Sequence, residues 1–118
     1  MLSYGIEHGV LVITVDGDPG RDDRPVLAQA ISDLVRAHRP APVVIVLDEP
    51  APGDAAVGVA LQAHRLCGPL GVLVSVATHS AAARRILEAE ADTDTHCTRL
   101  VVHARVDTAI AAAFAAAM

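Results

Sequence analysis

The stretch from Val43 to Leu61 constrains the fold most, because it joins a buried-strand pattern, an acidic loop and the start of a helix. Val43 to Leu47 is a run of apolar, mostly β-branched residues, typical of a strand that is covered on both faces. Pro50 and Pro52 end this strand, because proline lacks the N–H that a sheet ladder needs. Asp54 then precedes a helical segment and is expected to cap it. In α/β proteins, working residues lie in loops of this kind.

The other apolar runs and turn residues predict that strands and helices alternate along the chain. A strand over Leu2–Ile6 and a strand over Val10–Val15 are expected to pair as a hairpin. Asp22 or Asp23 can cap the next helix, and Pro25 suits its first turn. The later elements expected, in chain order, are the end of that helix at His38, the strand Val43–Leu47, a helix from Asp54 to about Cys67, a strand over Val72–Val76, a helix over Ala81–Glu90 whose Ile86 and Leu87 face inward, a strand over Leu100–Val102, and a helix capped by Asp107 with Ile110, Ala113, Phe114 and Ala117 on one face.

This β-β-α-β-α-β-α-β-α order indicates an α/β fold with a mixed sheet, parallel in its later part, and helices packed on it. The 118 residues suit a single domain over residues 1–118. Apolar residues make up 53% of the chain, enough for a sizeable core. Val, Leu, Ile and Ala must build that core, because the chain has only one Phe and one Tyr.

Charge and composition narrow the classes of partner. The formal net charge is −5, and all nine basic residues are arginine, which argues against a nucleic-acid surface and suits a basic protein partner. The N-terminal residues lack a signal-peptide pattern, and no apolar run has the length of a membrane span. Cys67 and Cys97 have no CxxC spacing and are expected to be reduced thiols. We therefore expect a cytoplasmic protein with no membrane contact.

Two kinds of chemistry have simpler alternatives in this sequence. Asp48 and Glu49 could act as a carboxylate acid and base, but the sequence around them shows no apolar pocket, and a solvated loop is the better interpretation. No metal or cofactor is expected, because no ligand spacing such as HxxxH is present and no glycine-rich phosphate loop can be read. The candidate metal ligands that this interpretation leaves unused are His38, His64, His79, His96 and His103 with Cys67 or Cys97.

Four local patterns, taken in order, carry a family resemblance. Gly17-Asp18 stands before the helix opened by Pro25-Val26-Leu27, and Asp54 follows the third strand. Arg84 to Glu88 and Val106 to Ala112 then mark the last helices. With this order and spacing the chain resembles, over nearly all its length, the STAS (SpoIIAA-like) domain of bacterial anti-sigma factor antagonists. The resemblance implies the STAS fold and a role in transcription regulation through protein–protein interaction.

The resemblance also implies a phosphorylation site that this chain has lost. In the family, a serine directly after the motif aspartate is phosphorylated by the partner, an anti-sigma factor that is a serine-protein kinase, and the added charge breaks the complex. Here that position is Ala55, followed by Ala56, and the motif glycine falls on Val57. The family's turn aspartate falls on Gly20. The partner-binding residues that the resemblance implies are Asp18, Asp48, Glu49, Asp54, Ala55, Ala56 and Val57.

Several alternatives stay open from the sequence. Ser75, Thr78 and Ser80 lie near the end of the fourth strand and could be displaced phosphate acceptors, although Ser80 is more simply a helix cap. Asp54 could contact a partner or only cap its helix. The alternative function is a small-ligand-binding or scaffold domain, and an enzyme ranks last. A homodimer is a further open alternative.

Overall fold

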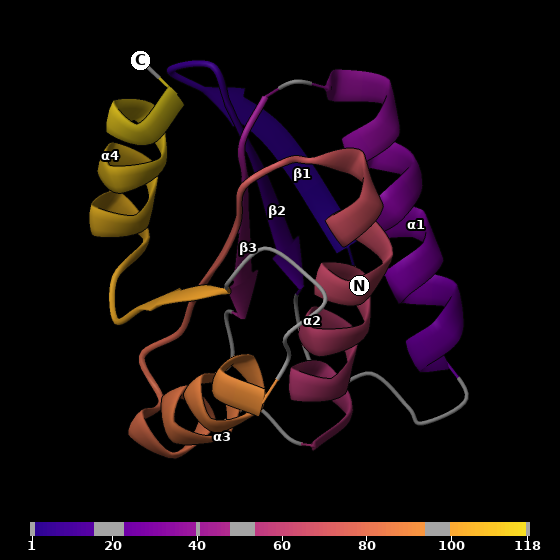
Figure 1. Ribbon diagram of the computed structural model, residues 1–118, viewed down its shortest axis with the longest axis vertical. Coiled ribbons are helices and arrows are strands. Elements are labelled where there is room, and N and C mark those ends of the chain that lie inside the picture. The colour runs from indigo at the N-terminus through magenta and orange to yellow at the C-terminus, as the bar shows by residue number, and fades with distance from the viewer. Residues whose placement is uncertain (1, 16–22, 40, 48–53, 94–99, 118) are drawn as a thin grey trace.

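The structure, a computed structural model, describes residues 2–15, 23–39, 41–47, 54–93 and 100–117, without the side chains of 54, 91–93 and 117. These residues form a five-stranded sheet with helices on both faces (Figure 1). The elements in order are β1 (Leu2–Glu7), β2 (Val10–Val15), α1 (Arg24–His38), β3 (Val43–Leu47), α2 (Asp54–Cys67), the short 3₁₀ helix η2 (Gly68–Leu70), β4 (Val74–Ala77), α3 (Ala81–Thr93), β5 (Val101–His103) and α4 (Val106–Ala117).

The strands lie side by side in their sequence order, β1-β2-β3-β4-β5. β1 pairs antiparallel with β2, and every later pair is parallel. β3 is therefore central, and all its residues are buried, as the run Val43–Leu47 predicts. The expected mixed α/β sheet is confirmed, and its topology matches that of the STAS (SpoIIAA-like) fold.

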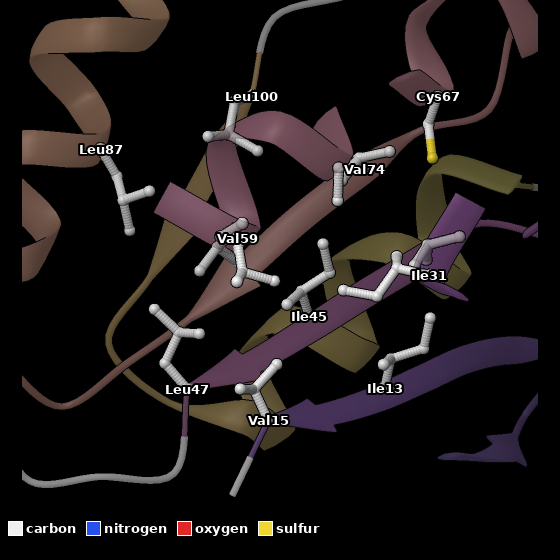
Figure 2. Packing of buried hydrophobic residues seen from close by; sticks show 14 of the residues in the cluster. Ile13, Val15, Ile31, Ile45, Leu47, Val59, Cys67, Val74, Leu87 and Leu100 are labelled. Carbon is white, nitrogen blue, oxygen red and sulfur yellow. The ribbon is translucent and has the colours of Figure 1, made fainter. Parts of the chain in front are cut away.

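The two faces of the sheet are covered differently (Figure 1). The larger core lies between one face and α1, α2 and α3, and its side chains include Ile13, Ile45, Ile31, Val59 and Leu87 (Figure 2). Each of these helices connects two neighbouring parallel strands, and the strands follow one another in the same direction across the sheet. Because such connections are right-handed, all three helices lie on the same face.

The second face of the sheet is covered by α4. Val44 and Val46 of β3 point to this face and pack against Ala109, Ile110 and Ala113 of α4. Successive side chains of β3 point to opposite faces of the sheet, so this strand contributes residues to both cores.

The hairpin between β1 and β2 is closed by His8 and Gly9, whose φ angles are 53° and 78°. Positive φ at both residues is the requirement of a type I′ turn, whose twist matches that of the flanking strands. Glycine meets this requirement without strain, and His8 carries the less favourable backbone. The expected hairpin is confirmed, with Glu7 belonging to β1 rather than to the turn.

Several other expected element boundaries were wrong. α3 continues to Thr93 rather than ending at Glu90, and β5 spans Val101–His103 rather than Leu100–Val102. β4 begins at Val74 rather than Val72, because η2 and Gly71, with a φ of 69°, carry the chain back toward the sheet. Leu73 still joins the ladder, since its carbonyl accepts the N–H of Val43 at 2.9 Å. Asp107 lies inside α4, and the residue before the helix is Arg105, whose carbonyl accepts the Ala109 N–H at 3.1 Å.

Two side chains expected in the core are exposed. Ile86 on α3 is 45% exposed, because its neighbour Leu87 takes the position that faces the sheet. Phe114 on α4 is also 45% exposed, and its ring lies at 6.2 Å from the His8 ring in an edge-on contact. Among the described residues, no helix is both long and apolar enough to cross a membrane.

Candidate functional site

The candidate site is the edge of the sheet at which the parallel strands end, here called the carboxyl edge. It is formed by the ends of β3 at Leu47, β4 at Ala77 and β5 at His103, and by the first turns of α2, α3 and α4. Because these helices begin where the strands end, their N-terminal backbone N–H groups gather at this edge. A helix N-terminus favours a negative charge, so the carboxyl edge is suited to contact acidic groups or a phosphate.

The first turn of α2 brings the matched motif residues to the carboxyl edge. The helix begins at Asp54 itself rather than after it, so Asp54 is not the residue before the helix. Ala55 is partly exposed, whereas Ala56 and Val57 are 2% and 4% exposed and belong to the large core. Of these described side chains, Ala55 is the one that a docked protein can touch.

Three of the residues expected to bind a partner lie outside the described residues. They are Asp18, between β2 and α1, and Asp48 and Glu49, between β3 and α2. Both segments start at the ends of strands on the carboxyl edge. Their part in partner binding stays a prediction, as does that of the residues on α2, of which Ala56 and Val57 are buried.

The turn between β4 and α3 is held by a set of local hydrogen bonds. The Thr78 hydroxyl accepts the Ser80 N–H at 3.2 Å, and the Ser80 hydroxyl accepts the Ala83 N–H at 3.2 Å. The Arg84 guanidinium donates to the Thr78 carbonyl at 2.9 Å, and the Thr78 N–H donates to the His103 carbonyl at 3.1 Å. The expected Ser80 cap of α3 is confirmed, and the Arg84 contact is a feature that residue spacing alone did not indicate.

This geometry bears on the alternative phosphate acceptors. Ser75 and Thr78 are each 2% exposed, so a kinase would need local unfolding to reach their hydroxyls. Ser80 is partly exposed, but its oxygen is the cap of α3. His79, between the last two, is exposed and was not expected to belong to the contact surface.

Within the described part of the carboxyl edge, the space between the strand ends is small. A cavity of about 20 Å³ lies there, lined by residues that include Leu47, His79 and Ala104, and it has room for about one water molecule. The strands of the described sheet also follow one another in sequence order, so this order has no reversal of the kind at which open α/β sheets form a ligand crevice.

The first helix does not supply a side-chain cap at this edge. Asp23 stands before α1, as expected for a cap, but its side chain makes no capping hydrogen bond. Pro25 takes the first turn of α1, as predicted.

His64 and Cys67, the candidate metal ligands on α2, are buried. His64 is 4% exposed and Cys67 is fully buried, and burial raises the pKa of the Cys67 thiol to about 11, partly offset by the Arg36 guanidinium. Among the described residues, no group of three or more His, Cys, Asp or Glu side chains is placed to hold a metal ion. Cys97 and His96 lie outside the described residues.

The comparisons with family models and with curated proteins identified no relative of this chain. No protein-family model matches the chain, and a search of curated proteins found no match either. The established result is the fold itself, a small α/β domain architecture with a mixed five-stranded sheet whose β1–β2 pair is antiparallel.

Proposed function

We propose that residues 1–118 form one cytoplasmic, STAS-like interaction domain that binds an anti-sigma factor of the serine-protein kinase type. It would regulate transcription as an antagonist that phosphorylation does not switch off. The observation that supports this proposal is the place of Ala55, partly exposed in the first turn of α2 at the carboxyl edge. That is where the resembled family carries its phosphorylated serine.

The chemistry of Ala55 explains the loss of the switch. A phosphate at this position would face the N–H groups of the first turn of α2 and add up to two negative charges to the contact surface. The methyl group of Ala55 has no oxygen to accept a phosphate. The surface therefore keeps the small, uncharged form that binds the kinase in the resembled family.

The experiment is a binding titration against a serine-protein kinase anti-sigma factor, with and without ATP, followed by intact mass measurement. We expect the same Kd in both conditions and no gain of phosphate. Ala55→Glu, which places a charge where the phosphate would be, should weaken binding about tenfold or more. Ala37→Glu is the matched control, because Ala37 is exposed in the last turn of α1, at the end of the sheet away from the carboxyl edge, and it should bind like the unaltered chain.

Two outcomes would contradict this function. A phosphate gained by the unaltered protein would show that another residue, such as Ser80, is the acceptor. Equal weakening by Ala55→Glu and Ala37→Glu would show that the contact does not centre on α2. Ala55→Ser is expected to regain phosphorylation only if the loop before α2 fits the kinase active site, which Val57 in place of glycine opposes.

The acidic residues before α1 and α2 are proposed to steer the encounter with the kinase. Asp18, Asp48 and Glu49 carry much of the charge of these segments. Charges at the rim of an interface act mainly on the association rate. Asp48→Asn combined with Glu49→Gln should lower the association rate at low salt, and the difference should shrink at high salt.

A second candidate function, binding of a small apolar ligand, is favoured by a groove on the second face of the sheet. The groove has a volume of about 580 Å³ and lies between the β1–β2 turn and α4, lined by Glu7, His8, Val106, Asp107, Ile110, Ala111 and Phe114. Its size is within the range of small-molecule sites. The fluorescent apolar probe anilinonaphthalene sulfonate should bind the folded protein, and Phe114→Ala should weaken binding while Val26→Ala, on α1, should not.

A further inference from the structure

β1 is an edge strand that lacks the usual protections against pairing with another chain. Its outer side has no neighbouring strand among the described elements. Residues Leu2–Glu7 contain no Pro and no Lys and pair with β2 without a bulge. Tyr4 and Ile6 are 58% and 52% exposed. A strand edge of this kind is a template for a further strand.

The type I′ turn determines which backbone groups of β1 face outward. In such a hairpin the residues next to the turn, Glu7 and Val10, exchange both hydrogen bonds, and bonded and non-bonded pairs then alternate. Glu7, Gly5 and Ser3 therefore bond to β2. The N–H and C=O groups of Leu2, Tyr4 and Ile6 point away from it.

The same three residues share one face of the sheet. Leu2, Tyr4 and Ile6 stand opposite Val15, Ile13 and Leu11 of β2, which are buried in the large core under α1. The Tyr4 ring is held toward the end of α1, with its centroid 5.8 Å from that of the His38 ring. The outward backbone groups and the exposed apolar side chains of β1 thus belong to the same residues.

We propose that two copies of this chain pair through β1, antiparallel, with Tyr4 opposite Tyr4 of the partner subunit. Leu2 then lies opposite Ile6 of the partner subunit, and each of these residues exchanges hydrogen bonds with its opposite. Side chains that are opposite in an antiparallel pair lie on the same face, so the apolar residues of both copies form one continuous seam.

The charges on β1 agree with this register. Glu7 lies beyond Leu2 of the partner subunit and away from the partner's Glu7, so like charges do not meet. A second copy is favoured as the occupant because β1 is complementary to itself in this register. The pairing extends the sheet at β1 and leaves the carboxyl edge uncovered, so it does not rest on the proposed function.

A strand pair of this length buries less than the area of about 1,200 Å² that stable complexes bury, so the dimer is weak. The test is sedimentation equilibrium from about 1 µM to about 1 mM, with an expected Kd on the order of 10–100 µM. Tyr4→Lys should shift the dimer to monomer, because it sets two positive charges opposite each other. The matched control Val26→Lys, at a residue of α1 that is 69% exposed, should dimerise like the unaltered chain.

A mixing experiment tests the register. Tyr4→Lys and Tyr4→Glu should each be monomeric alone, and their mixture should form a heterodimer in native mass spectrometry, because the changed residues face one another. Monomeric behaviour of the unaltered chain at about 1 mM, or dimerisation of Tyr4→Lys at the unaltered Kd, would overturn the proposal.

A measurement on the unaltered chain makes the test independent of any variant's folding. With rising protein concentration, hydrogen exchange at the backbone amides of Tyr4 and Ile6 should slow. The amides of Ser3 and Gly5, already bonded within the hairpin, should change much less. Protection of all four amides to the same extent, or of none, would contradict pairing through this edge.

Discussion

Gly9 is the residue whose backbone the hairpin needs most. Its φ is 78°, and a Cβ built there would meet nothing within 4 Å, so a side chain costs backbone strain rather than space. Gly9→Ala should lower the free energy of unfolding by about 1–2 kcal/mol. Gly5→Ala, in β1 with equally open space, is the matched control and should change it by less than about 0.5 kcal/mol. Equal losses in urea titrations would contradict a special role of the turn.

Cys67 gives the stability a pH dependence with a definite sign. The folded state keeps the thiol protonated up to about 11, whereas the unfolded chain loses the proton near 9. Between these values the unfolded state binds fewer protons, so stability falls as pH rises, by at most about 1.4 kcal/mol per pH unit. Denaturation of the unaltered chain and of Cys67→Ala from pH 8 to 11 should show a steeper fall for the unaltered chain. Parallel curves would contradict this assignment.

The side chain of Arg24, at the start of α1, lies against Gly58 of α2. A Cβ at this position would lie 2.7 Å from Cδ and 2.8 Å from Nη1 of Arg24, which is the exposed, flexible part of that side chain. Gly58→Ala should therefore raise the free energy of unfolding by up to about 1 kcal/mol, because alanine favours the helix and Arg24 can move aside. Arg24→Ala combined with Gly58→Ala should give a similar gain. A loss with Gly58→Ala that Arg24→Ala restores would show that Arg24 cannot move.

The elements could be predicted where one strong local signal decided them. β3 has the bounds of its apolar run, and β2 has those of the run Val10–Val15. Helix ends were less certain, because Asp107 has the chemistry of a cap but lies within α4. Ile86 and Leu87 are adjacent and equally apolar, so only the packing of α3 on the sheet decides that Leu87 is buried.

For the molecule as a whole, the position of the carboxyl edge could be predicted from the sequence. The accessibility of the side chains at that edge could not. Ala55, Ala56 and Val57 are all small and apolar, and only the packing of α2 on the sheet leaves Ala55 partly exposed and buries the other two. The hydrogen bond from Arg84 to Thr78 depends in the same way on how α3 follows β4. Such contacts depend on how elements pack on one another, and a residue pattern within one element does not predict them.

The helices on the two faces of the sheet should also differ in their free energy of opening. α4 buries Ala109, Ala113 and Ile110, whereas the opposite face buries larger side chains such as Ile31 and Leu87. Because burial of apolar area is the main stabilising contribution, α4 should open without the rest of the sheet unfolding. Native-state hydrogen exchange should give α4 amides a free energy of opening about half that of α2 amides.

The matched variants for this prediction are two isoleucines on helices. Ile110→Ala should lower the opening free energy of α4 by about 2 kcal/mol, because Ile110 is 8% exposed and packs on the sheet. Ile86→Ala, at a residue that is 45% exposed on α3, should cost less than about 1 kcal/mol and leave α4 exchange unchanged. If α4 and α2 amides exchange with one common free energy in all three proteins, the two faces unfold together. The groove beside Phe114 would then be as rigid as the core under α1.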